Sequence, residues 1–455
     1  MVSIFRLCSW LGKLTRTIIL TPHTYTVGNC AEDIYFGLLQ ARREGKKLLI
    51  LYPYELPWRL RFGLPNIELI NIESEYRFPL RNSYYITGCV LITAYFCFFR
   101  TLSLVVRLLF GRHLNDLYRT PRIGALTLCQ PEEKMSSFSW DVVDQYDWRK
   151  QLETPLQVSL SMKKKVIAER LLVQMGLPKD AWFVCLHVRE SGFRDSASFK
   201  ENDCYYERNA NILKYIGAIE EITSRGGWVV RMGDASMTRL PVMEQVIDYP
   251  FTGVKSALMD IYLISQCRFY IGMVSGIYSV AELFQRPMIT MNLCNWLQAP
   301  QKRGDVAIFK HVYSISRKRF LTIPEWLSEP WSAVSYSHKL GEDYVFYENN
   351  PDELRAPIRE FFNRDNDWRP TELQCKFTKL RILRGREMIG NVLISEKEVT
   401  QYFRKDVVNY DLAERYRLAS RLDSAIGVLG AEFLEQNWAF DTEDHGLAER
   451  WISGH

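Results

Sequence analysis

The sequence lacks the patterns that identify several protein classes most directly. It contains no Asn-x-Ser/Thr sequon, no Cys-x-x-Cys pair and no stripe of Lys or Arg interleaved with aromatic side chains. The missing basic stripe sets nucleic-acid binding aside. The ten cysteines are scattered, so we expect free thiols in a reducing compartment. No internal repeat or low-complexity tract is present, which excludes repeat architectures.

Two further absences concern cofactors and export. A nicotinamide-binding Rossmann unit normally shows Gly-x-Gly-x-x-Gly after its first strand, whereas residues 21–30 offer only Gly28. A Rossmann oxidoreductase is therefore a further alternative and not the main prediction. The start of the chain forms no convincing signal peptide, because Lys13 and Arg16 interrupt the apolar run and no small-residue cleavage site follows. We expect a cytoplasmic location, either free or peripheral on the inner face of the membrane.

Strands and helices alternate in two separate stretches of the chain. Residues 17–20 and 48–52 have the apolar character of buried strands, and residues 31–43 carry apolar positions at helical spacing between them. The second stretch predicts strands at 182–188, 228–232, 268–272 and 288–292, and helices at 209–224, 257–266 and 277–284. Such alternation indicates a parallel sheet that is covered on both faces. We predict an α/β protein with two Rossmann-like domains and a helical C-terminal tail.

The domain limits follow from the irregular, proline-containing stretch at 120–160. A chain of 455 residues suggests two or three domains. We place an N-terminal Rossmann-like domain at 1–150, a C-terminal Rossmann-like domain at 151–345, and a helical tail that packs across both at 346–455.

Positive charge and apolar residues gather in the first quarter of the chain. Residues 1–119 contain fifteen basic and eight acidic side chains, a net charge of +7, whereas the remainder carries −2. This excess favours contact with an anionic membrane face. Residues 82–99 contain no charge, and Arg100 and Arg107 extend this run as an amphipathic helix. We predict a membrane-associating segment at 82–110. Three alternatives are open for it: a buried element of the first domain, a helix in the membrane interface, or a true membrane span.

The strongest cluster of polar residues directly follows the strand at 182–188. His187 and Arg189 alternate with apolar residues and therefore point to one side of the strand end, and Arg194 follows in the next loop. Ligands of open α/β sheets bind outside the carboxyl ends of the strands, and guanidinium groups bind phosphate bidentately. This pattern predicts a phosphate site, with a buried ion pair as the alternative.

A second cluster joins the strand at 268–272 to the following helix. Gly272 and Gly276 allow close approach of the backbone to a ligand, and Ser275 is placed to cap the helix, whose N-terminus favours phosphate. Glu282, two turns on, either accepts hydrogen bonds from a ribose or faces solvent.

A third cluster lies at the end of the strand at 228–232. Arg231 and Gly233 predict a second cation for a diphosphate and a close-approach loop. The alternative is structural pairing of Arg231 with Asp248 or Asp260.

The run from His187 to Pro287 resembles a family of bacterial glycosyltransferases from polysaccharide-biosynthesis clusters. Besides His-x-Arg, the matching elements are Arg208-Asn209, Gly226-Gly227, Val229 to Gly233, Asp248-Tyr249, Asp260 to Ile264 and Ser275-Gly276. The His-x-Arg element is also similar to that of fucosyltransferase-like enzymes of the GT-B fold, in which the Arg contacts the donor diphosphate.

The resemblance implies a GT-B enzyme that binds its nucleotide-sugar in the C-terminal domain, its acceptor in the N-terminal domain, and no essential metal or other cofactor. Asp365-Asn366-Asp367 matches the Asp-x-Asp of metal-using enzymes, but it lies in a charged loop after the second series. The predicted donor-binding residues are His187, Arg189, Arg194, Asn209, Arg231, Gly233, Asp260, Gly272, Ser275, Gly276 and Glu282.

The catalytic base is expected near the first strand-to-helix turn, where Glu32, Asp33 and His23 are candidates. We predict an inverting, metal-independent glycosyltransferase that moves a sugar to a glycan or lipid-linked acceptor in surface polysaccharide or glycoconjugate biosynthesis. The alternative is a non-catalytic protein of the same fold that binds a glycan or a partner. The sequence does not specify the sugar, the nucleotide or the acceptor.

Overall fold

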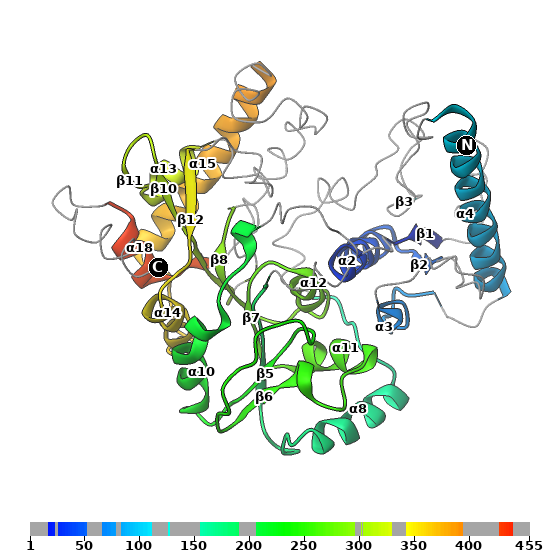
Figure 1. Cartoon of the computed structure of the whole chain (residues 1–455), viewed down its shortest axis with the longest axis horizontal. Helices are drawn as coiled ribbons and strands as arrows, with labels where there is room; N and C mark the ends of the chain where they lie inside the picture. Colours follow the sequence, from blue (N-terminus) through cyan, green and yellow to red (C-terminus); the bar gives the residue numbers. More distant parts are fainter. Residues whose placement is uncertain are drawn as a thin grey trace.

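The computed structural model describes residues 17–22, 26–51, 66–78, 83–111, 126–127, 155–190, 206–295, 302, 304–329, 343–394 and 427–439. Its main body is a parallel sheet with helices on both faces, and a smaller sheet lies beside it (Figure 1). The prediction of a mixed α/β fold with a parallel sheet is confirmed.

The main sheet has seven strands in the order β13-β9-β8-β7-β4-β5-β6, and all neighbours are parallel. The strands are β4 (Phe183–His187), β5 (Trp228–Arg231), β6 (Val246–Asp248), β7 (Tyr270–Gly272), β8 (Met288–Leu293), β9 (Val306–Phe309) and β13 (Val428–Leu429). Apart from β13, this is the 3-2-1-4-5-6 order of a doubly wound sheet. The direction of winding reverses between β4 and β7.

Alternating side chains of β4 explain why the sheet is covered on both faces. Val184 and Leu186 belong to one buried cluster, whereas Phe183 and Cys185 belong to the other. Because side chains alternate across a strand, each face needs its own layer of helices. The first layer contains α10 (Ile216–Thr223) and α14 (Pro351–Phe362); the second contains α11 (Ala257–Gln266) and α12 (Gly276–Leu283).

The smaller sheet is built by the first strand-helix-strand unit. Strand β1 (Thr17–Thr21) pairs in parallel with β2 (Lys47–Ile50), and β3 (Leu126–Thr127) adds an antiparallel edge. Helix α2 (Val27–Glu44) connects β1 to β2 and ends at Gly45, whose left-handed φ of 62° is typical of a glycine that ends a helix. The predicted unit is confirmed, but α2 begins four residues before the predicted start at residue 31.

Helix α2 also packs against α12 of the main body, so the two sheets do not have separate cores. One buried cluster runs from Ile18 and Leu20 of β1 through α2 to Leu283 of α12. The short helix α3 (Ile67–Ile70) and helix α8 (Met162–Gln174) both contact α11 at this side. The division into domains at residue 150 stays a prediction.

Helix α4 (Ser83–Phe110) stands at the outer edge of the smaller sheet (Figure 1). Cys89 and Thr93 are buried, whereas the last two turns are largely exposed. The interpretation of 82–110 as a buried element therefore fails for its C-terminal end. Within the described part of the chain, no helix combines the length and hydrophobicity that a membrane crossing requires.

The residues predicted as a tail contribute to the main body. They include α14, α15 (Glu372–Ile394), β13 and α18 (Ala431–Asn437), and β13 adds a strand to the sheet beside β9. A small antiparallel sheet precedes them, made of β10 (His311–Ser314), β11 (Arg319–Phe320) and β12 (Tyr344–Tyr347), with α13 (Ile323–Ser328) after β11. Packing of a tail across two domains stays a prediction.

Candidate functional site

The carboxyl ends of β4 and β7 meet at the point where the winding of the main sheet reverses. Here the Nδ1 atom of His187 lies 3.1 Å from the hydroxyl of Ser275, and the Met273 N–H donates to the His187 carbonyl at 3.2 Å. In open α/β sheets, ligands bind in the crevice at such a point. The structure thus brings together His187 and Ser275, which the sequence placed in two separate motifs.

Gly272 makes this approach of β4 and β7 possible. Its φ is 149°, and a Cβ atom there would lie 2.1 Å from the His187 carbonyl oxygen. Any side chain would therefore push the two strand ends apart. The sequence predicted that Gly272 allows close approach of a ligand. In the structure, the group that approaches Gly272 closely is the His187 carbonyl of β4.

Ser275 occupies the N-cap position of α12 but does not cap the helix. Its side chain makes no cap hydrogen bond and is directed to His187 instead. Gly276, the first residue of the helix, is exposed. The first N–H groups and the positive end of the helix dipole therefore face an accessible region, as anion-binding helix ends do.

Two arginines border the same helix start. Arg208 donates from Nη2 to the Val274 carbonyl at 2.8 Å, and Arg189 donates from Nη1 to the side-chain oxygen of Asn209. The N–H of Ala210 donates to the Arg189 carbonyl at 2.9 Å, which ties this segment to the end of β4. The cluster is thus held by backbone and side-chain bonds that fix the direction of both guanidinium groups.

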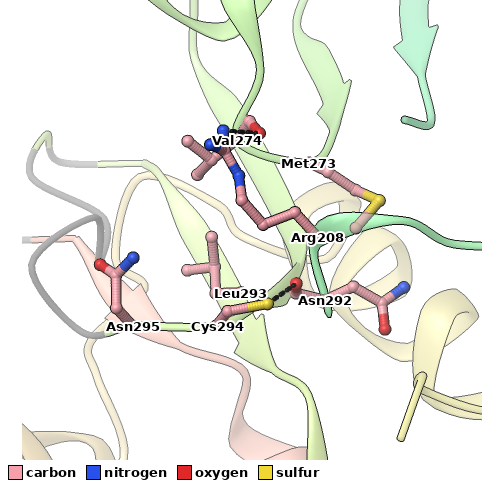
Figure 2. Close-up of a pocket in the computed structure, with 7 residues that line it drawn as sticks. All are labelled: Arg208, Met273, Val274, Asn292, Leu293, Cys294 and Asn295. Carbon is pink, nitrogen blue, oxygen red and sulfur yellow. Dashed lines mark hydrogen bonds between the residues drawn. The ribbon is translucent and has the colours of Figure 1, made fainter. Parts of the chain in front are cut away.

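An open hollow lies between Arg208 and the end of β8 (Figure 2). Its volume is about 10 Å³, which is room for about one water molecule. The lining residues are Arg208, Met273, Val274, Asn292, Leu293, Cys294 and Asn295. The hollow continues the β4–β7 edge toward the next strand, so it extends the candidate site in the direction of β8.

Burial and nearby cations set the state of Cys294 in this hollow. Burial raises the pKa of the Cys294 thiol to about 11, although Lys310, Arg208 and Arg189 act in the opposite direction. The thiol donates to the Glu207 carbonyl at 3.0 Å. Cys294 is therefore a neutral structural group at physiological pH and no nucleophile.

Several supporting residues were not singled out in the sequence. Lys310 donates to the Asn209 carbonyl at 2.7 Å from beneath the cluster, and burial lowers its pKa. Asn292 donates to the Tyr215 hydroxyl at 2.9 Å and exchanges two bonds with Asn349. Asn292 is the last residue of the last predicted strand, and only this strand-end position could have identified it from the sequence as a residue that supports the site.

The environment of His187 is poor in solvent and rich in positive charge. Burial lowers the pKa of His187 to about 4, with Arg231 and Arg189 acting in the same direction and Asp234 opposing them. The imidazole is therefore neutral at physiological pH. A neutral ring bonded to Ser275 is suited to hold the loop, and the local positive potential favours an anion.

Arg231 forms a buried structural ion pair at the carboxyl end of β5. It is 0% exposed, donates to Asp248 at 3.0 Å and donates to the Thr238 carbonyl at 2.9 Å. These contacts correspond to the structural pairing with Asp248 that the sequence offered as the alternative to diphosphate binding. Gly233, with φ 146°, packs beneath Met237, whose sulfur would lie 2.1 Å from an added Cβ.

Other predicted donor residues lie away from the helix start. Asp260 bonds to Lys255 at 3.0 Å in the first turn of α11. Glu282 neither faces solvent nor lines the hollow, because it is buried where α12 meets α2. His23 and Arg194 fall outside the described residues.

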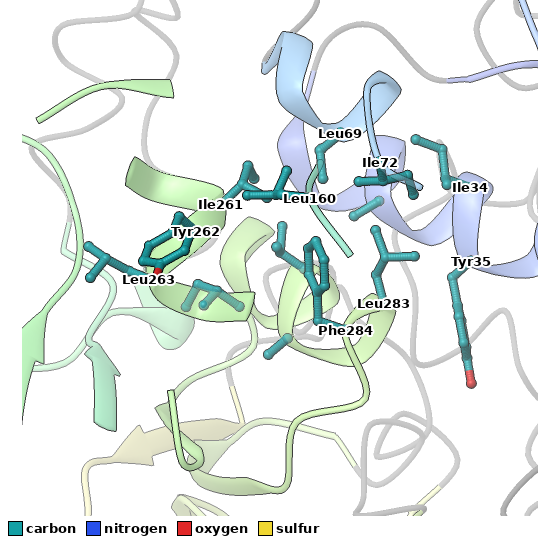
Figure 3. Packing of buried hydrophobic residues seen from close by; sticks show 14 of the residues in the cluster. Ile34, Tyr35, Leu69, Ile72, Leu160, Ile261, Tyr262, Leu263, Leu283 and Phe284 are labelled. Carbon is teal, nitrogen blue, oxygen red and sulfur yellow. The ribbon is translucent and has the colours of Figure 1, made fainter. Parts of the chain in front are cut away.

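Two of the candidate bases, Glu32 and Asp33, lie on α2, whose amino end touches that of α12. A Cβ at Gly28 would lie 2.8 Å from the Gly276 Cα. Farther along, the two helices share an apolar contact that includes Ile34 and Leu283 (Figure 3). Glu32 is partly exposed and Asp33 is buried. Since α2 starts at Val27, both residues lie in its second turn.

Burial raises the pKa of Glu32 well above its usual value, and Glu282 and Asp33 raise it further. The pKa of Glu282 is raised by burial as well, against the opposing charge of Lys302. A raised pKa makes the carboxylate form of such a group a stronger base than an ordinary Glu side chain. Among the described residues, no group of three or more His, Cys, Asp or Glu side chains is arranged to hold a metal ion.

The comparisons with known proteins add little to this geometry. No protein-family model matches the chain, and no curated protein matches it. The fold is similar to a solved structure described as "The crystal structure of the glycosyl transferase family 9 from Veillonella parvula DSM 2008". The TM-score is 0.32 at 13% sequence identity, over 60% of this chain and 80% of that one. A likeness of this degree carries no argument about the activity of this chain.

Proposed function

We propose that this protein is a glycosyltransferase that binds the diphosphate of a nucleotide-sugar at the β4–β7 edge. One observation carries the proposal: an uncapped helix start, held by the His187–Ser275 bond, lies at the winding reversal with Arg208 beside it. Helix starts and guanidinium groups are the usual protein partners of phosphate. The sequence between His187 and Pro287 resembles that of bacterial glycosyltransferases, and this resemblance is our reason for proposing a sugar as the transferred group.

In the proposed reaction, an acceptor hydroxyl attacks the anomeric carbon, and the bond to the diphosphate oxygen breaks. The N–H groups of α12, Arg189 and Arg208 stabilise the negative charge that develops on the leaving diphosphate. Glu32 takes the acceptor proton, because it keeps solvent access and has a raised pKa, whereas Asp33 is buried. A single displacement inverts the anomeric configuration, and no metal is required.

Nucleotide binding tests the proposed donor site. UDP, GDP and CMP are added to the purified chain, and the melting temperature is recorded, since a ligand of the folded state raises it. One of these nucleotides is expected to bind, and Arg189→Gln to weaken its binding about 10- to 100-fold through loss of a charged hydrogen bond. Arg225→Gln is the matched control, because Arg225 pairs with Glu221 on the surface of α10. Equal affinities in both variants would contradict the site.

Transfer itself separates an enzyme from a binding protein of the same fold. Nucleotide-sugars are screened for hydrolysis or transfer, and NMR of the anomeric proton of the product reports inversion or retention. Glu32→Gln is expected to abolish transfer while nucleotide binding persists, and Glu44→Gln, in the last turn of the same helix, is expected to keep transfer. Nucleotide binding without turnover of any donor supports the non-catalytic alternative.

A further inference from the structure

The carboxyl end of α4 carries the largest group of exposed apolar side chains on any described helix. Leu104 is 57% exposed, Leu108 75%, Leu109 70% and Phe110 66%. Gly111 ends the helix with a left-handed φ of 62°. Exposure of this many large apolar side chains together marks a surface that is covered by something other than water.

The distribution of these side chains around the helix axis indicates what kind of partner fits. Successive residues are about 100° apart, so Leu108, Val105 and Leu109 lie about 40°, 100° and 140° from Leu104, and Phe110 about 240°. Val106, at about 200°, is buried against the rest of the protein, so the continuous exposed apolar face spans about 140°, from Leu104 to Leu109. An apolar face of this width next to an exposed arginine is typical of a helix that lies in the membrane interface, with its apolar side in the acyl region beneath the lipid headgroups.

The charge of the helix is complementary to anionic lipid. The 28 residues of α4 include two arginines and no acidic side chain. Arg107 is exposed within the apolar tip, and a long cationic side chain of this kind reaches the headgroups while its neighbours insert. We propose that the end of α4, residues 104–110, docks onto a membrane surface that contains anionic lipids. This inference does not depend on the proposed activity.

Vesicle binding by the full chain tests the proposal. The protein is sedimented with vesicles of phosphatidylcholine alone and with vesicles of equal parts phosphatidylcholine and phosphatidylglycerol, and the mixed vesicles are expected to bind more. Leu108→Glu with Leu109→Glu is expected to weaken binding at least about tenfold, because two inserted apolar side chains are lost. Arg107→Gln is expected to weaken binding to the mixed vesicles about fivefold and to change binding to phosphatidylcholine little.

The matched control is Val242→Glu with Leu383→Glu, two exposed apolar positions outside α4. This variant is expected to bind vesicles like the unmodified protein, and thermal unfolding checks that all variants are folded. Failure of the unmodified protein to bind either vesicle overturns the proposal. It is also overturned if the control loses as much binding as the α4 variant. A dimer in solution that the α4 substitutions dissociate would overturn it too, because a second copy would then cover the tip.

Discussion

Helices α2 and α12 begin side by side, and each has an N-cap residue without a cap bond and a glycine close to its start. The charged side chains near the two starts differ. The N-cap residues, Thr26 and Ser275, make no side-chain cap bond, and a glycine near each start lets the two backbones touch. Near the start of α12 lie Arg208 and the neutral His187, whereas α2 contributes Glu32 to the contact. One start is thus suited to an anion, and the other supplies carboxyl groups to the same region.

The largest effect in this comparison is expected at Gly28. In Gly28→Ala the new Cβ meets the Gly276 backbone, which cannot move alone, so we expect the free energy of unfolding to fall by about 1–3 kcal/mol. Gly37→Ala in the same helix is the control, because its Cβ would meet the movable side-chain ends of Leu48 and Leu20. Urea unfolding measures both. A loss at Gly37 as large as that at Gly28 would show that the helix contact is not tight.

This contact explains where prediction from the sequence succeeded and where it stopped. The βα alternation was visible because strands buried on both faces are continuously apolar, as at β4 and β8. The sequence around Gly28 indicated a turn, since glycine disfavours helices. In the fold, Gly28 lies inside α2 because only a residue without a Cβ fits against Gly276, and that neighbour is about 250 residues away along the chain.

The same limit applied to the site: the local pattern was visible in the sequence, but contacts between distant segments were not. His187 and Ser275 were both recognisable as strand-end residues, but their hydrogen bond depends on β4 and β7 being neighbours, which is a property of strand order. Arg231 had the same appearance in the sequence as Arg189, and only the fold pairs it with Asp248. The two-residue strand β13 has no local signal at all, because its pairing with β9 is set by tertiary packing.

A smaller effect is expected from the carboxyl groups between the helices. Because the pKa of Glu32 and that of Glu282 are raised on folding, the folded chain binds more protons than the unfolded chain above about pH 4.5. Stability should therefore fall as pH rises through the folded pKa values. Lys302, Asp305 and Asp33 act on the same groups, and the lowered pKa of Lys302 works in the opposite sense only at alkaline pH.

Glu282→Gln removes one of the two carboxyl groups and lowers the pKa of Glu32. As the pH rises above about 4.5, we expect the variant to lose less stability than the unmodified protein, because the remaining carboxyl group ionises more easily. Denaturant unfolding across this pH range measures the difference, with Glu435→Gln on the surface of α18 as the control. Parallel pH curves for the unmodified protein and Glu282→Gln would mean that the raised pKa values do not affect folding.

The smallest effect on stability is expected for Ser275→Ala. It distinguishes a serine that caps its helix from one that holds the His187 ring in place. Ser256 occupies the N-cap of α11 and accepts the Met259 N–H at 3.3 Å, so Ser256→Ala should cost about 1 kcal/mol of stability. Ser275→Ala should cost about half as much, since a neutral side-chain hydrogen bond to His187 is lost and no cap bond. The decisive readout is the imidazole NMR signal of His187, which should change in Ser275→Ala alone. If it stays unchanged while the helix is destabilised as in Ser256→Ala, the Ser275 hydroxyl caps α12, and its N–H groups are not available to a phosphate.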